Sequence, residues 1–429
     1  MFSTIKRRLL FLTIVTLAAF LWSATYTFNL FLPDFTWRQH RLTGQGKEVD
    51  DPIISSFASG ALFVSHEPLF TVKGYEIDRR QKQVIHHYDP PLARLAPLMP
   101  QLLNLRLVAR EQLEREIENQ YKLFTASHRG EDRYNIPLTS IMYLDRQGQL
   151  HTSALWLGEI DAPVCSPQGQ CYLVAEEPFH AKKNVWYSPD GGTTWQQLTQ
   201  WRFPDPDVPA EFYEQKLLNA DAGRLWLADQ YRLSVSEDQG QSWQTAADIR
   251  PLLKRNPLDL ENSAEQNTSL SRLRWYVDSR QRLLADMTLS LHEGRQERRL
   301  LYRVISAQQE QLLAPTIQDI ARSPQGEIFF TRRINNSRNG LYRLQENGTP
   351  GLVFEHFDRL GKIYAGHHLL AVEKDVGDRT HLYLSRDRGE QWQRYKLPGK
   401  NSAFDGEGDR FIRFRQYYRT LNYQISTLD

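Results

Sequence analysis

The chain has 429 residues, of which 40% are apolar and 11% are aromatic. This is enough apolar material for a folded core, so wholesale disorder is excluded, and a closed all-β ring of this length can be a single domain. The net charge is only +2, and the basic residues are spread along the chain. No dedicated basic face is predicted, so nucleic acid is not an expected partner.

The first predicted element is a membrane-spanning helix in residues 1–34. Lys6, Arg7 and Arg8 precede an uncharged stretch that ends at Asp34, and about 20 apolar residues are enough to cross a bilayer. The apolar core of a cleaved signal peptide is shorter, ~7–15 residues. A cleaved peptide and a buried helix of a soluble fold are the alternatives to an uncleaved anchor.

The basic cluster predicts the orientation of this anchor, because Lys and Arg next to a spanning helix remain in the cytoplasm. We therefore expect a single-pass protein of the bacterial inner membrane with a cytoplasmic N-terminus. Residues 35–54 are expected to form a linker, and residues 55–429 a folded domain in the periplasm.

Residues 90–126 interrupt the strand-like pattern of the rest of the chain. After Pro90 and Pro91, apolar residues from Leu103 to Phe124 recur with the 3.6-residue period of a helix. The pattern predicts a helical insertion, which either caps one rim of the fold or provides a lid or a partner-binding element.

Cys165 and Cys171 are the only cysteines. They flank a Pro-Gln-Gly turn that predicts a hairpin, and in an oxidising compartment the pair is expected to close into a small-loop disulfide. A metal site is not expected, because two thiols without further ligands leave the coordination of a metal unfilled.

One eight-residue pattern occurs three times, each time after a short apolar strand. Its form is Ser-x-Asp-x-Gly-x-(Ser/Thr/Gln)-Trp, which suits a tight turn: Ser and Asp side chains bond to nearby backbone N–H groups, Gly supplies a positive φ, and Trp packs back over the hairpin. The residues that define the three copies are Ser188, Asp190, Gly192 and Trp195, then Ser236, Asp238, Gly240 and Trp243, then Ser385, Asp387, Gly389 and Trp392.

These motifs resemble the Asp-box, or bacterial neuraminidase repeat, of the β-propellers of sialidases and sortilin-type receptors. The resemblance implies that each box joins the third and fourth strands of a propeller blade, away from the ligand face. Its aspartates are then structural. Calcium binding by the boxes is not expected, since each turn offers too few oxygens for about six ligands.

Weaker copies extend the repeat along the chain. Turn starts fall near residues 77, 145, 188, 236, 304, 344 and 385, and four further turns precede second apolar strands. Together they predict an all-β propeller of about seven four-stranded blades, with six or eight as the alternatives. The stretch from Arg410 to Tyr418 is expected to close the ring.

The sequence contains no recognisable catalytic motif. The sialidase arginine motif is replaced by Arg133-Tyr134-Asn135-Ile136-Pro137, with Asn135 at the arginine position, so no catalytic residue is transferred from that family. Asp229 and Asp286 end two near-duplicate strands, and they either cap turns or reach the central channel.

We therefore expect a non-enzymatic, protein-binding module without a cofactor or metal. Its partner is expected in the periplasm, as for an envelope assembly factor or a protein that confers immunity to a toxin. The alternative is a glycan-binding or glycoside-hydrolysing protein of the sialidase type, in which exposed aromatic residues and paired carboxylates would face the channel.

Overall fold

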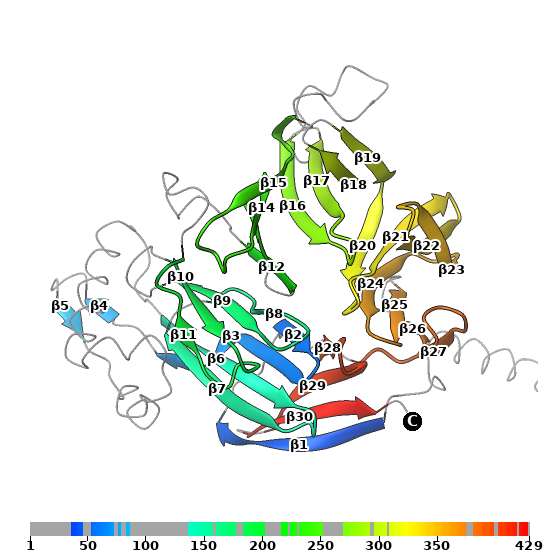
Figure 1. Cartoon of the computed structure of the whole chain (residues 1–429). Coiled ribbons are helices and arrows are strands. Elements are labelled where there is room, and N and C mark those ends of the chain that lie inside the picture. Colours follow the sequence, from blue (N-terminus) through cyan, green and yellow to red (C-terminus); the bar gives the residue numbers. More distant parts are fainter. Residues whose placement is uncertain are drawn as a thin grey trace, which may run out of the picture.

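The computed structural model in Figure 1 consists of strands arranged around a ring. It describes residues 36–45, 53–72, 76–78, 83–85, 136–157, 160–176, 183–201, 216–221, 224–229, 231–251, 269–291, 296–306, 309–374, 381–398, 402–417 and 420–427. Within these ranges there is no helix of the length and hydropathy needed to span a bilayer. The expected anchor in residues 1–34 and the expected helical insertion at 90–126 lie outside the described residues.

Seven four-stranded antiparallel sheets form the blades of a β-propeller, which confirms the predicted fold and blade number. Blade 1 contains β2 (Ile53–Phe57), β3 (Gly60–Val72), β6 (Ile136–Asp145) and β7 (Leu150–Leu157). Blade 2 contains β8 (Val164–Cys165), β9 (Cys171–Glu176), β10 (Lys183–Ser188) and β11 (Gln196–Gln197). Blade 3 contains β12 (Lys216–Asp221), β13 (Arg224–Ala228), β14 (Arg232–Ser236) and β15 (Gln244–Asp248).

The next three blades follow in chain order. Blade 4 contains β16 (Ser269–Val277), β17 (Leu283–Leu291), β18 (Gln296–Ser306) and β19 (Gln309–Ala314). Blade 5 contains β20 (Ile317–Arg322), β21 (Ile328–Asn335), β22 (Arg338–Leu344) and β23 (Pro350–His356). Blade 6 contains β24 (Leu360–Ala365), β25 (Leu370–Lys374), β26 (Leu382–Ser385) and β27 (Gln393–Tyr395).

Blade 7 closes the ring with strands from both ends of the chain. It contains β28 (Ser402–Asp405), β29 (Arg410–Tyr417), β30 (Thr420–Thr427) and, as its outermost strand, β1 (Thr36–Gln45). Figure 1 shows the red C-terminal strands beside blue β1. Residues 36–45 of the predicted linker at 35–54 are therefore not a linker, because they form β1, which pairs along β30 and joins the two ends of the chain in one blade.

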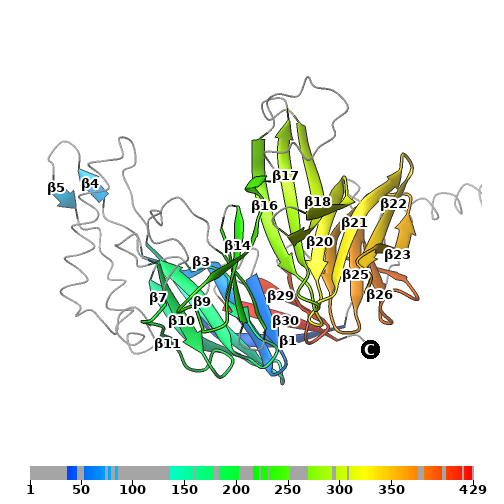
Figure 2. The same cartoon turned by 45° about the horizontal axis from the view of Figure 1, so that its top comes forward.

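The predicted repeat holds for six blades and fails for one. The third strands end at or within two residues of the expected turns at 145, 188, 236, 304, 344 and 385. The expected turn near residue 77 is not part of a blade: β4 (Glu76–Asp78) and β5 (Gln83–Ile85) form a separate two-stranded sheet, which lies apart from the blades in Figure 2. The seventh blade comes instead from the closure by β1 and β30.

The innermost strands surround a central channel. A cavity of about 540 Å³ is lined by residues of all seven of them, among which are Ile54, Val164, Leu218, Trp275, Ala321, Ile363 and Ala403. Apolar clusters lie between consecutive blades, as between blades 4 and 5, where Leu284 and Leu301 pack with Ile317 and Phe330. This burial of apolar surface between sheets holds the ring together.

The alternating strand directions give the ring two different faces. Connections from first to second strands, and from third to fourth strands, all lie at one end, which we call the turn face. Connections from second to third strands, and from each blade to the next, lie at the opposite end, the cleft face. Residues 73–135, 202–215 and 252–268 connect strands at the cleft face. In propellers as in other folds, long connections on a rigid scaffold are where binding residues concentrate.

Candidate functional site

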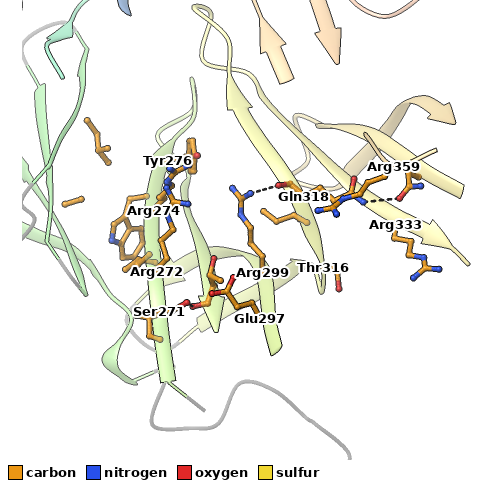
Figure 3. A pocket seen from close by; sticks show the side chains of 18 of the residues that line it. Ser271, Arg272, Arg274, Tyr276, Glu297, Arg299, Thr316, Gln318, Arg333 and Arg359 are labelled. Atoms are coloured by element: carbon orange, nitrogen blue, oxygen red, sulfur yellow. Dashed lines mark hydrogen bonds between the residues drawn. The ribbon is translucent and has the colours of Figure 1, made fainter. Parts of the chain in front are cut away.

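A large cleft opens on the cleft face. It has a volume of about 1510 Å³, and its walls come from β12, β16, β18 and the ends of blade 5 (Figure 3). Five arginines line it, against two carboxylates, Asp229 and Glu297; the arginines are Arg272, Arg274, Arg299, Arg333 and Arg359. Asp229 is occupied by an ion pair with Arg232, with 3.0 Å between Oδ2 and Nε. Arg299 is likewise paired with Asp286, which leaves four arginines against Glu297, so the cleft carries a net positive charge.

The innermost strand of blade 4 carries the central part of this charge. Arg272, Arg274 and Tyr276 are alternate residues of β16, so their side chains lie on one face of the sheet. Figure 3 shows them in a row along the strand. Arg272 and Arg274 are exposed, and no ion pair of either is found among the described residues. Burial raises the pKa of Tyr276 to about 12, so its hydroxyl is neutral at physiological pH.

The third strand of blade 4 adds a fixed arginine. Arg299 donates from Nε and Nη2 to the two oxygens of Asp286, at 2.7 and 2.6 Å, and from Nη1 to the Gln318 carbonyl oxygen at 2.5 Å. Burial by itself lowers the pKa of Arg299, but the hydrogen bonds and charge of Asp286 raise it above its usual value. The Arg299 side chain is thus held in place in the wall of the cleft, and its bond to the Gln318 carbonyl oxygen connects blade 4 to blade 5 (Figure 3).

Blade 5 continues the wall through a chain of amide contacts. Gln318 Nε2 donates to Asn339 Oδ1 at 3.1 Å, and Asn339 Nδ2 donates to the Asp358 carbonyl oxygen at 3.1 Å. Arg333 donates to the carbonyl oxygens of its own loop at Asn335 and Asn336, at 3.0 and 2.9 Å. These bonds hold the rim of blade 5 in place without using a carboxylate.

Two further carboxylates, Asp286 and Asp319, lie behind this wall and are not available for acid–base chemistry. Asp286 is 2% exposed and engaged by Arg299. Asp319 accepts the Ile363 N–H at 2.8 Å, and burial raises its pKa above the usual range. Neither side chain lines the cleft. The site presents positive charge and hydrogen-bond donors to whatever enters it, which suits the binding of anionic groups.

Asp229 and Asp286 have different roles in the structure, although they end two similar segments of the sequence. Asp229 caps the β13–β14 turn by accepting the N–H groups of Tyr231 and Arg232, at 2.9 and 2.6 Å. For Asp286 the expectation of a turn cap or a channel residue is wrong, because it lies inside β17 and faces Arg299.

The three Asp-boxes lie between third and fourth strands, on the turn face. In the first, Ser188 Oγ donates to Asp190 Oδ1 at 2.8 Å and accepts the Gly192 N–H at 2.7 Å, while Asp190 accepts the Thr194 N–H and Oγ1 at 2.8 and 2.7 Å. Gly192 has a φ of 90°. The serine and backbone N–H bonds recur around Ser236, Asp238 and Gly240, and around Ser385, Asp387 and Gly389. The hydroxyl bond recurs in the second box, from Ser242, but not in the third, where Gln391 has no hydroxyl.

The tryptophan of each box packs against the preceding blade as well as against its own hairpin. Trp195 Nε1 donates to Ser153 Oγ of β7 at 2.9 Å, and its ring packs with Phe57 and Leu62 of blade 1. Trp243 packs against residues of blade 2, and Trp392 against residues of blade 5. Each box therefore stabilises a turn through its Ser and Asp and stabilises the contact between two blades through its Trp.

Hydrogen bonds to the box aspartates account for their acidity. Bonds from Ser242 and Ser236 lower the pKa of Asp238 to about 2, and those from Ser385 and the Gln391 N–H lower the pKa of Asp387. These carboxylates are ionised and occupied. Among the residues that the structure describes, no group of three or more potential metal ligands occurs.

Cys165 and Cys171 form the predicted disulfide across the β8–β9 hairpin, with a Cα–Cα distance of 4.1 Å. It lies at the turn face of the channel, and Cys165 lines the channel cavity.

Sequence reasoning missed the arginine cleft. The alternation of Arg272 and Arg274 in the strand-like segment Ser-Arg-Leu-Arg-Trp was a signal, because it predicts two cations on one strand face. Four aromatic residues of the blade strands that could have served a glycan site are all buried: Trp226 (5% exposed), Trp275 (3%), Phe329 (3%) and Phe330 (0%).

Comparison with known proteins does not assign the chain to a family. No protein-family model matches the chain, and no curated protein matches its sequence. Three similar solved structures come from proteins of different kinds. Oligogalacturonate lyase from Vibrio parahaemolyticus has a TM-score of 0.42 and 8% identity, with 93% of this chain and 98% of that chain covered. TolB from Acinetobacter baumannii has a TM-score of 0.34 and 11% identity, with 80% of each chain covered. The β-propeller domain of the Trilobed protease from Pyrococcus furiosus has a TM-score of 0.40 and 7% identity, with 69% of this chain and 92% of that chain covered. None of these comparisons identifies the Asp-box family, which stays a prediction from the motifs.

Proposed function

We propose that the chain is a protein-binding module that receives an acidic part of its partner in the arginine-lined cleft. The observation that carries the proposal is the pair Arg272 and Arg274, two exposed guanidinium groups side by side on β16 with no described ion pair. A cationic cleft attracts a negatively charged partner and orients it during association. Arginine is also enriched in the energetically important centres of protein interfaces.

The same geometry argues against the two alternatives. An enzyme of the glycosidase type needs two carboxylates at the reacting bond. Of the two carboxylates that line the cleft, Asp229 is paired with Arg232 and only Glu297 remains, while Asp286 and Asp319 are bonded within the wall. Trp275, the tryptophan that lines the cleft, is 3% exposed, so it offers no ring face on which a sugar could stack. An acidic glycan would still match the charge of the arginines, so it serves as the competing outcome in the experiments below.

We further propose that residues 1–34 anchor the propeller to the bacterial inner membrane, with the propeller in the periplasm. The length of the apolar run, the basic residues before it and the disulfide support this topology. The expected result is that the full chain stays in the membrane pellet after alkaline extraction and is digested by protease added to spheroplasts. A chain that is released by alkali, or that is protected in intact spheroplasts, contradicts the proposed topology.

A site-specific cross-linking experiment tests the binding face. Ser271 and Ser279 are exposed serines in and just beyond the same strand, β16, with Ser271 at the cleft and Ser279 in the turn at the opposite face. A photo-reactive amino acid at position 271 of the full chain in its native membrane is expected to give a discrete protein adduct, and the same group at 279 none. Equal adducts at both positions, or none at 271, would refute the proposal.

The identity of that adduct also separates the two biological roles that we propose for the module. An envelope protein of the same cell as the cross-linked species indicates an assembly factor. An adduct that forms only when a toxin is delivered to the periplasm indicates an immunity protein.

A further inference from the structure

An exposed apolar surface on blade 5 lies directly beside the cleft. Ile334, Leu352 and Phe357 are 37%, 51% and 70% exposed, and we call these three residues the apolar shelf. Monomeric proteins rarely expose large apolar side chains as neighbours without an interaction partner. The shelf is therefore a second candidate contact surface.

The residues of the shelf share one face of the blade. A Cβ placed on Gly340 would lie 2.8 Å from Leu352 Cδ1 and 3.0 Å from Ile334 Cδ1, so both side chains lie over this glycine. Arg338, two residues earlier on β22, places its guanidinium 5.3 Å from the centre of the Phe357 ring. Arg338 also forms an ion pair with Glu355. This arginine orients the ring and leaves most of its surface exposed.

The shelf approaches the arginine cleft at Phe357. Phe357 is two residues before Arg359, which lines the cleft, whereas Ile334 lies on the face of β21 opposite to its neighbour Arg333, another cleft residue. Asn339, which also lines the cleft, donates to the Asp358 carbonyl oxygen next to Phe357. An occupant of the cleft that extends toward the outer edge of blade 5 therefore meets the shelf.

We infer that the cleft and the shelf form one bipartite site for a protein segment in which acidic side chains are followed by an apolar one. The acidic part pairs with Arg272 and Arg274, and the apolar side chain packs on Phe357 and Leu352. Aromatic anchors next to arginines are typical of the centres of protein interfaces. An acidic polysaccharide has the charge for the cleft and could stack a sugar ring on Phe357, but it has no apolar side chain to pack on Leu352. This inference rests on the proposed function and adds the chemistry of the partner.

The test uses the full chain in its native membrane, with a benzophenone side chain in place of Phe357. The control carries the same group in place of Ile305, an apolar residue that is 47% exposed near the turn-face end of β18. Position 357 is expected to give an adduct of the same mass as position 271, and position 305 none. The double change Arg272→Gln/Arg274→Gln is expected to reduce the adduct from 357 at least tenfold. Phe357→Ala is expected to reduce the adduct from 271 several-fold.

The possible failures are distinguishable. An adduct from 271 without one from 357, or adducts of different mass at the two positions, overturns the bipartite site and leaves the proposed function intact. No adduct from 271 overturns both. An adduct from 271 that survives exhaustive protease digestion identifies a polysaccharide occupant and also overturns both. Because Phe357 is largely exposed, thermal unfolding of Phe357→Ala is expected to match that of the unmodified chain, so loss of the adduct is not a folding defect.

Discussion

Among the residues that the structure describes, Arg299 is the one that forms an ion pair with the buried Asp286 carboxylate, and replacing it by methionine removes this pair. Asp286 is 2% exposed and receives two charge-assisted hydrogen bonds from Arg299. Breaking a buried ion pair by removing one partner costs about 3–5 kcal/mol, because the remaining charge is left uncompensated. A domain of roughly 375 residues has an unfolding entropy of about 0.8 kcal/mol/K. Arg299→Met is therefore expected to lower the melting temperature by about 5 °C.

The double variant Asp286→Leu/Arg299→Met is the matched control. Replacing both members of a buried pair with apolar groups is often neutral or stabilising, so its melting temperature is expected to return close to that of the unmodified chain. The assay is thermal unfolding followed by circular dichroism, supported by urea titration. An Arg299→Met variant within 1 °C of the unmodified chain, or a double variant less stable than the single one, would refute the reasoning about this pair.

The remaining predictions concern the rest of the ring. Asp238→Ala is expected to lower the melting temperature, since it removes the bonds to Ser236 and Ser242; the exposed neighbour change Glu237→Ala should not, and equal effects would contradict a structural role for the box. Reducing the Cys165–Cys171 disulfide is expected to destabilise the fold by about 2 kcal/mol, from the entropy of a loop of about seven residues; an unchanged urea midpoint with reductant would argue against this. Burial, together with Lys374 and Arg394, lowers the pKa of His381 to about 4. The unfolded chain therefore takes up this proton first as the pH falls below about 6.5, so from pH 7 to 5 the free energy of unfolding is expected to drop by at most about 2 kcal/mol through this group. His381→Gln should remove that part of the pH dependence, and an identical pH profile in the variant would disprove it.

The sequence predicted the features of this fold that depend on local chemistry. The Asp-box needs Ser, Asp and Gly within a few residues, so its turns were identifiable, as was the hairpin that pairs Cys165 with Cys171. Strand β1 was missed because its segment, residues 36–45, is polar and its pairing partner lies almost 400 residues away in β30. A pattern of neighbouring residues cannot predict a strand pairing between the two ends of the chain.

The candidate site depends on contacts between blades in the same way. Arg299 is fixed by Asp286 across the sheet and by Gln318 of the next blade, and the shelf residue Leu352 meets Ile334 only over Gly340. Which blades face each other, and which residues share a face, follows only once the register and the closure of the ring are known. The alternation of Arg272 and Arg274 was visible in the sequence, but the cleft that they line was not.

The central claim, that the arginines of β16 hold the partner, is tested most directly by neutralising them in matched pairs. Arg272→Gln/Arg274→Gln removes two cations from the cleft, and Arg224→Gln/Arg280→Gln removes two from the turn face, where they pair with Glu237 and Glu346. With the photo-reactive group at position 271, each lost charge-assisted contact is worth about 1.5–3 kcal/mol, so the cleft variant is expected to lose at least nine-tenths of its adduct. The turn-face variant is expected to keep it. Equal yields from the two variants would contradict the account.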